Sequence, residues 1–184
     1  MQPRTASAFR GLYDRHHRDV LAYFLRRTDR DSALECTEDV FLVAWRRLGD
    51  VPEGERELRW LYGVARRVLA NRRRSMMRRA RLTRRLLGLG AASPEEPETQ
   101  LIQRIEEQEV IDALGHLSPA DQEIVRLAYW EELPHADIGK IVGCSAGAVD
   151  TRLHRAVRRM EKELVSPGHK PRERLIASPG DEKR

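Results

Sequence analysis

Cysteine and long apolar runs are scarce in this sequence of 184 residues. The two cysteines, Cys36 and Cys144, lie far apart without CxxC spacing or a secretory leader, so we expect neither a disulfide framework nor a zinc site. No apolar run approaches the roughly 20 residues that a membrane span requires, which argues against a transmembrane helix. We therefore expect a cytoplasmic protein that carries no metal ion or other cofactor.

Signatures of the common enzyme classes are also missing. The sequence has no phosphate-binding glycine loop, no nucleophile elbow and no HExxH pair. Its histidines show no metal-ligand spacing. We predict a protein without catalytic activity of its own.

Acidic residues are absent from one long stretch. Between Leu58 and Leu87 every charged residue is an arginine, whereas from Glu95 to Asp112 the charged residues are almost all acidic. The arginines are Arg59, Arg66, Arg67, Arg72, Arg73, Arg74, Arg78, Arg79, Arg81, Arg84 and Arg85. The whole chain carries a formal charge of only +5. The distribution of charge, more than the net charge, therefore indicates that the arginine stretch binds phosphate.

Apolar residues recur at helical spacing along most of the chain, and no stretch alternates as a strand does. The pattern predicts an all-α fold of two small helical domains joined by a flexible linker. Three amphipathic helices are expected in the first domain, within residues 9–24, 33–48 and 58–69. Four are expected in the second, within residues 101–114, 118–128, 134–142 and 145–164.

The domain boundaries follow from breaks in this pattern. The first domain is expected to span residues 5–87 and the second residues 100–165. Between them, residues 88–99 are rich in glycine, alanine, serine and proline without periodicity, which is typical of a linker. Proline, glycine and alternating charges predict a disordered tail from residue 166 to residue 184.

The last two helices have the pattern of a helix-turn-helix. A short helix after Pro134, a turn at Gly143 and a longer basic helix capped by Ser145 form the kind of unit whose second helix enters the DNA major groove. A helical hairpin with a solvated basic face is the alternative, which the glycine turn and the cap make less favourable. The candidate groove residues are Ser145, Asp150, Thr151, Arg152, His154, Arg155 and Arg158. Arginine pairs with guanine or phosphate, and Asp150 is able to accept from a cytosine amino group.

The arginine stretch is a second candidate for nucleic-acid binding. Trp60 and Tyr62 lie at its start, where aromatic rings among arginines suit phosphates and unstacked bases. Both rings also lie near the apolar stripe, so at least one is expected in the core. A third surface carries Glu35, Glu38 and Asp39, which suit a basic partner, although acids near a helix start are also favoured by the helix dipole.

Four stretches resemble, in this order, motifs of the extracytoplasmic-function (group 4) branch of the sigma-70 family. Residues 33–45 (ALECTEDVFLVAW) are similar to AEDLVQEVFLRAW, and residues 60–67 (WLYGVARR) to WLYRIARN. Leu117-Ser118-Pro119 with Glu123 resembles LSPxxRE, and residues 147–156 (GAVDTRLHRA) resemble GTVKSRLHRA. The resemblance covers Phe9 to Leu164.

The resemblance implies an alternative sigma factor that binds core RNA polymerase and directs promoter-specific initiation. The first domain would bind the polymerase beta-prime clamp through Glu35, Glu38, Asp39 and Phe41. It would capture the minus-10 element through Arg59, Trp60, Arg66, Arg67, Asn71 and Arg74. The second domain would read the minus-35 element and contact the beta flap, and the acidic linker would run through channels otherwise used by RNA. An anti-sigma factor is an expected further partner.

The sequence departs from the family pattern at several of these positions. Asp150 stands where a lysine or arginine is usual, Asn71 where an aspartate is common, and Glu38 where a glutamine is usual. Two other functions remain open: a stand-alone helix-turn-helix regulator that binds an operator as a dimer, and a nucleic-acid-processing enzyme whose arginine helix grips RNA. Binding to core polymerase would distinguish a sigma factor from both.

Overall fold

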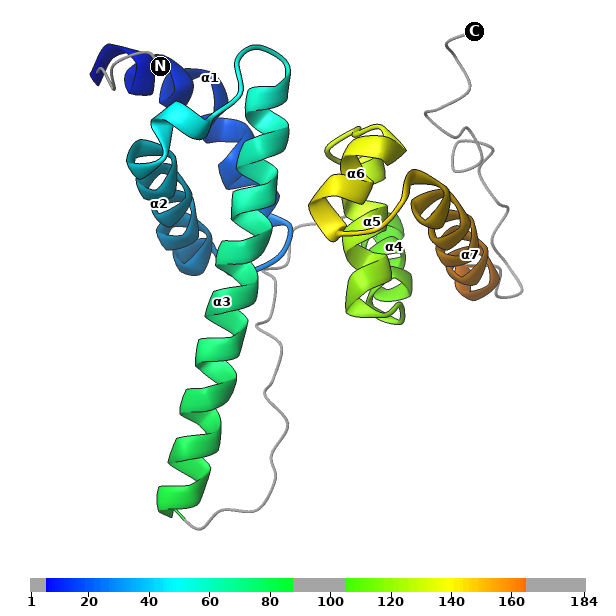
Figure 1. Cartoon of the computed structure of the whole chain (residues 1–184). Helices are drawn as coiled ribbons and strands as arrows, with labels where there is room; N and C mark the ends of the chain where they lie inside the picture. Colours follow the sequence, from blue (N-terminus) through cyan, green and yellow to red (C-terminus); the bar gives the residue numbers. More distant parts are fainter. Residues whose placement is uncertain (1–5, 88–104, 165–184) are drawn as a thin grey trace, which may run out of the picture. The chain divides into compact units, whose positions relative to one another are not determined.

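The computed structural model describes residues 6–87 and 105–164, and within these ranges the chain forms seven α-helices, one short 3-10 turn and no strand (Figure 1). The all-α prediction is confirmed for this part of the chain. The chain divides into two compact units, residues 1–100 and 101–184. The expected linker (88–99) and tail (166–184) lie outside the described residues. Among the described helices, none is long and apolar enough to cross a bilayer.

The first unit is a bundle of three helices, α1 (Ala6–Leu25), α2 (Arg30–Arg46) and α3 (Arg56–Leu87), each in contact with the other two. Asp29 caps α2 by accepting a hydrogen bond from the Ser32 amide at 2.9 Å. This bond lowers the pKa of the Asp29 carboxyl. The core contains Leu12, Val20, Tyr23, Phe24, Ala33, Cys36, Val40, Phe41, Ala44, Leu61, Tyr62, Val64, Ala65 and Leu69.

Helix α3 is much longer than its packed part. It contains 32 residues, which corresponds to about 48 Å of helix. Leu69 is its last buried side chain among those described, and Met76 and Met77 beyond it are 60% and 64% exposed. Figure 1 shows α3 continuing well past the ends of α1 and α2. This outer part is rich in arginine, alanine, leucine and methionine, which favour a helix without tertiary packing.

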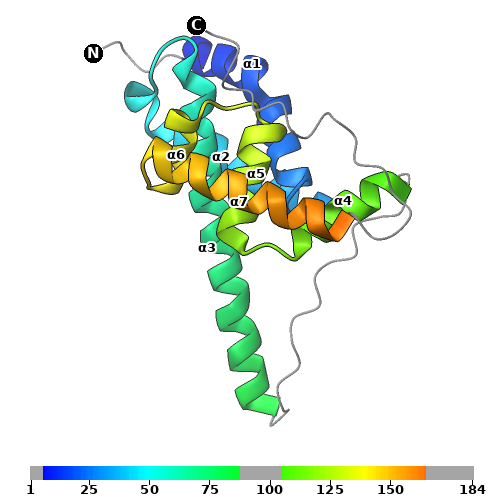
Figure 2. The ribbon, with the colours of Figure 1, turned by 90° about the vertical axis from the view of Figure 1, so that its right-hand side faces the viewer.

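The second unit contains α4 (Ile105–Gly115), α5 (Pro119–Tyr129), α6 (His135–Val142) and α7 (Ala146–Leu164). Helix α7 packs against the other three, and Figure 2 shows it lying across α5. Ser118 caps α5 and Pro119 is its first residue, as the sequence predicts. The core contains Ala113, Leu114, Leu117, Ile124, Val125, Leu127, Ala128, Leu133, Ile138, Val149, Leu153, Ala156 and Met160.

The turn between α5 and α6 contains a residue in an unfavourable backbone conformation. Glu132 has a φ of 49°, in the left-handed region that favours glycine. This conformation turns the chain so that the Leu133 amide donates to the Leu127 carbonyl at 3.0 Å and the Leu133 side chain is buried. The packing of Leu133 therefore offsets the backbone strain at Glu132.

Candidate nucleic-acid interface

A tight glycine turn sets the angle between α6 and α7. Gly143 has a φ of 83°, and the amides of Gly143 and Cys144 both donate to the Gly139 carbonyl, at 2.8 and 2.9 Å. A Cβ atom on Gly139 would lie 2.6 Å from the Cys144 carbonyl oxygen, so glycine permits this close approach. The Ser145 hydroxyl then accepts from the Ala148 amide at 3.2 Å. The predicted turn and cap of the helix-turn-helix are both confirmed.

Helix α7 has one buried face and one exposed face. Val149, Leu153, Ala156 and Met160 are buried, and they recur at the spacing of one helical face. Five of the predicted groove residues lie exposed on other faces: Asp150, Thr151, His154, Arg155 and Arg158. An exposed face that combines arginines with short polar side chains suits both phosphate oxygens and base edges. The contact of these residues with DNA stays a prediction.

Arg152 differs from these residues because it is bound within the unit. Its Nε and Nη2 atoms lie 2.9 and 2.8 Å from Oδ1 of Asp121 in α5, and the Ser118 hydroxyl donates to the same carboxylate at 2.6 Å. Burial alone would raise the pKa of the Asp121 carboxyl. The hydrogen bonds from Ser118 and Arg152 have a larger combined effect in the other direction, so the net result is a lowered pKa. The sequence groups Arg152 with the DNA contacts, whereas in the structure it joins α7 to α5.

One exposed residue of α7 lies beside a histidine of α6. The Nδ1 atom of His135 is 3.5 Å from Oδ1 of Asp150. The His135 side chain is 20% exposed and that of Asp150 is 68% exposed. The sequence pattern does not indicate this pair, because the two residues belong to different helices.

The arginine surface of α3 begins inside the bundle and continues outside it. Arg67, Asn71 and Arg74 are exposed, and Arg74 donates to the Asn71 side chain. Arg59, Trp60 and Arg66 are half-buried. Tyr62 is only 4% exposed and stacks on Tyr23 with 5.5 Å between the ring centroids, which confirms that one of the two early aromatic residues is in the core.

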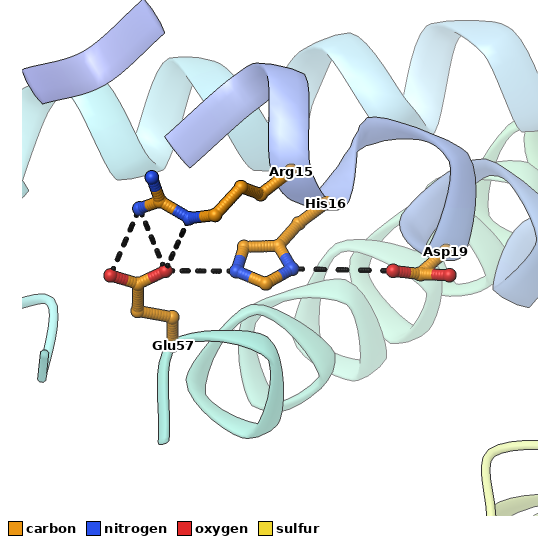
Figure 3. Close-up of polar contacts among 4 residues, drawn as sticks. All are labelled: Arg15, His16, Asp19 and Glu57. Carbon is orange, nitrogen blue, oxygen red and sulfur yellow. Dashed lines mark hydrogen bonds and ion pairs between the residues drawn. The ribbon is translucent and has the colours of Figure 1, made fainter. Parts of the chain in front are cut away.

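A polar cluster holds the start of α3 against α1 (Figure 3). The Arg15 guanidinium donates to both Glu57 oxygens at 3.1 and 2.9 Å, and Nε2 of His16 lies 2.9 Å from Oε2 of Glu57. On the other side of the ring, Nδ1 of His16 is 4.0 Å from the Asp19 carboxylate. Burial alone would raise the pKa of Glu57. The hydrogen bonds from His16 and Arg15 have a larger combined effect in the other direction, so the net result is a lowered pKa. A charged Glu57 therefore fixes the direction in which α3 leaves the bundle.

The outer face of α2 carries the expected acidic residues. Glu35, Glu38 and Asp39 are exposed. Glu35 accepts a hydrogen bond from Arg72 of α3, which also donates to the Ser32 hydroxyl at 2.8 Å. The bond to Glu35 raises the pKa of Arg72. Glu35 is therefore part of the α2–α3 contact. Of the three acidic residues, Glu38 and Asp39 face outward and form no ion pair within the described residues.

The structure places Phe41 inside the bundle, where its side chain is only 3% exposed, and its contact with a partner stays a prediction. The rings of Phe9 and Tyr13 in α1 cover it, with centroids 6.4 and 4.8 Å away. The exposed apolar side chains of α2 are instead Leu34, Leu42 and Trp45, at 44%, 45% and 40% exposure. The outer face of α2 is therefore both acidic and apolar.

Solved structures share this fold. The sigma factor RpoE of Bartonella quintana, solved in complex with the anti-sigma factor NepR, superimposes with a TM-score of 0.64 over 85% of this chain and 96% of that chain, at 22% identity. CnrH, solved with the cytosolic domain of CnrY, gives a TM-score of 0.59 over 86% of this chain and 88% of that chain, at 20% identity. Both similarities concern the arrangement of the helices.

Sequence comparison identifies the family. Residues 107–160 match the family model "Sigma-70, region 4". The ECF RNA polymerase sigma factor BldN of Streptomyces coelicolor is 29% identical over 89% of this chain, which spans 62% of the length of BldN. The ECF RNA polymerase sigma factor SigL of Mycobacterium tuberculosis is 31% identical over 89% of this chain and 92% of SigL. The chain therefore belongs to the family of ECF RNA polymerase sigma factors, which makes it a transcription initiation factor.

Proposed function

We propose that this chain binds core RNA polymerase through the outer face of α2 and directs it to promoters with two DNA-binding surfaces. The arginine surface of α3 contacts the minus-10 element, and the exposed face of α7 reads the minus-35 element. In this role the chain supplies recognition, and the polymerase performs the chemistry, so the chain needs no catalytic activity of its own. We place this activity in the cytoplasm, where polymerase and chromosome meet.

The observation that carries the proposal is the exposed face of α7 behind a tight glycine turn. Gly143 and the Ser145 cap present the first turns of α7 at one end of the unit, and Arg155 and Arg158 are exposed along the helix. In a helix-turn-helix, these N-terminal turns are the ones that enter the major groove. Helix α3 adds a second surface on which no acidic residue follows Glu57.

The proposed polymerase-binding face combines charge with apolar area. Glu38 and Asp39 supply negative charge, and Leu42 and Trp45 lie one and two turns further along α2. A partner with basic residues around an apolar stripe would satisfy both components, and charge complementarity would speed its association. The beta-prime clamp is the proposed partner here, and the beta flap is the proposed partner of the second unit.

The test separates the two surfaces. Replacing Glu38 and Asp39 together by lysine should weaken binding to core polymerase, measured by competition with a labelled sigma factor, and should leave the unfolding transition unchanged. Asp14→Lys, at an exposed carboxylate of α1, is the charge-reversal control. Replacing Arg155 by alanine should reduce minus-35-dependent run-off transcription and leave core binding intact.

The outcomes distinguish the proposal from its alternatives. If the wild-type chain binds promoter fragments equally well with and without core polymerase, it acts as a stand-alone regulator and the sigma role is wrong. If Glu38→Lys with Asp39→Lys competes as well as wild type, the outer face of α2 is not the polymerase contact. An anti-sigma protein is a further proposed partner, since RpoE of Bartonella quintana was solved with one.

A further inference from the structure

His135 and Asp150 lie together at the end of the unit where α7 begins. We propose that they form a specificity-determining pair, in which His135 positions the Asp150 carboxylate to accept a hydrogen bond from a cytosine amino group at one base pair of the minus-35 element. Asp150 is the base-reading residue and His135 is the positioning residue. The inference rests on the proposed DNA-binding role of α7.

The placement of the two side chains supports these separate roles. Asp150 is the fifth residue of α7 and its side chain is 68% exposed, so one carboxylate oxygen is available to a ligand. His135 is the first residue of α6, and its ring is 20% exposed with Nδ1 3.5 Å from Oδ1 of Asp150. The tight turn at Gly143 holds α6 and α7 at this distance. The Asp150 carboxylate is therefore exposed to a ligand, and the less exposed His135 ring lies beside it.

The far side of the His135 ring indicates where its proton lies. Nε2 is buried and has no hydrogen-bond partner within the described residues. With its proton on Nε2, the neutral imidazole would leave a buried N–H without an acceptor and turn the Nδ1 lone pair toward the carboxylate. With its proton on Nδ1, it turns a donor toward the carboxylate instead. The tautomer with its proton on Nδ1 is therefore favoured, and this nitrogen is the one that lies 3.5 Å from Oδ1 of Asp150. The second oxygen of the Asp150 carboxylate therefore stays available to a ligand.

The neighbouring groups leave this carboxylate available. Arg155 and Thr151 interact with each other, since Nε of Arg155 donates to the Thr151 carbonyl at 3.3 Å. Arg152 is bound to Asp121 on the other side of the helix. Within the described residues, the polar side chain beside Asp150 is that of His135. No arginine of α7 therefore forms an ion pair with Asp150.

A free carboxylate discriminates among base edges because it only accepts hydrogen bonds. Guanine presents two acceptors in the major groove and thymine presents one, and both repel a carboxylate. Adenine presents a donor beside an acceptor, an arrangement that suits an amide side chain. Cytosine presents its amino donor alone and pairs well with aspartate or glutamate. Phosphate oxygens also repel Asp150, which favours a contact on a base edge over one on the backbone.

The test uses the full chain assembled with core polymerase and a set of labelled promoter duplexes in which each base pair of the minus-35 element is replaced in turn. Wild type should prefer cytosine at one base pair by roughly fivefold in affinity, the lower end of what a base-edge contact supplies. Asp150→Ala should lose this preference and keep those at the other base pairs. His135→Ala should lose most of it, and His135→Asn, which keeps a donor near the place of Nδ1, should restore it.

A matched control and three outcomes complete the test. His116→Gln removes a histidine that pairs with Glu163 elsewhere in the same unit, and it should leave every base preference unchanged. An unchanged cytosine preference in Asp150→Ala overturns the assignment of the base-reading residue. A wild-type pattern in His135→Ala overturns the positioning role of His135. If no replacement in the duplex alters wild-type affinity, α7 does not read the minus-35 element, and the proposed function fails as well.

Discussion

Arg152 and Arg155 are one helical turn apart in α7. We expect replacement of Arg152 by alanine to lower the stability of the second unit, and replacement of Arg155 by alanine to weaken promoter binding. Arg152 makes two contacts below 3 Å with Asp121, and the side chains are 33% and 19% exposed. Hydrogen bonds to charged groups contribute about 1.5–3 kcal/mol when buried, and exposed ion pairs contribute about 0.2–1 kcal/mol. For this partly exposed pair we expect Arg152→Ala to lower the free energy of unfolding by about 1–2 kcal/mol. Arg155, which is exposed, should change it by less than about 0.5 kcal/mol.

Urea unfolding followed by tryptophan fluorescence measures this difference. With Trp45 and Trp60 replaced by phenylalanine, the signal comes from Trp130 in the second unit. Promoter binding by the assembled polymerase, measured by anisotropy, should differ in the other direction. Arg155→Ala should bind the promoter more weakly, and Arg152→Ala should bind it about as well as wild type at low urea. Equal destabilisation by the two replacements, or wild-type stability of Arg152→Ala, would refute the assignment of Arg152 to the α5–α7 contact.

Three further predictions concern stability. Because the pKa of Glu57 is lowered below its ordinary value of 4.5, its charged form stabilises the first unit above that pH, and this contribution is lost as the pH falls below about 4.5. Glu57→Gln should therefore reduce the loss of stability at acid pH, measured by circular dichroism. A loss as steep as that of wild type would contradict the role of the cluster. Glu132→Gly should raise the free energy of unfolding by about 0.5–1 kcal/mol, because glycine adopts a φ of 49° without strain, whereas Glu132→Ala should give no gain. Gly139→Ala should cost about 1–3 kcal/mol, since its Cβ would meet a backbone carbonyl, while Gly147→Ala, with open space around the Cβ, should cost nothing in thermal melts.

Local signals in the sequence predict much of the fold. Apolar spacing predicts the seven described helices in order, because each helix buries one stripe. The ends are predicted where a cap or a glycine has a local partner: Ser118 and Ser145 bond to amides three residues on, and Gly143 adopts a left-handed conformation. The outward face of α7 follows from the same periodicity.

Roles that depend on partners distant in sequence are not predicted. Arg152 and Arg155 have the same chemistry, and only the position of Asp121, 31 residues from Arg152, separates a structural arginine from an exposed one. Phe41 is buried because the rings of Phe9 and Tyr13 cover it. Trp45 contacts Phe9 near the end of α2 and is still 40% exposed. No local pattern contains this information. The contacts of His135 and Glu57 are missed for the same reason.

The continuity of α3 has a mechanical consequence. Glu57 is anchored on α1 and Arg74 lies outside the bundle, and because the helix between them is unbroken, they are separated by about 26 Å along a stiff rod. The outer arginines would therefore lie at a fixed distance from a protein bound to the outer face of α2, and at a fixed rotation around the axis of α3. Adding one residue to α3 after Asn71 would turn every later arginine by about 100° around the axis without altering the composition of the surface. The first unit thus fixes both the distance and the rotation of the outer arginines, measured from the cluster of Arg15, His16 and Glu57.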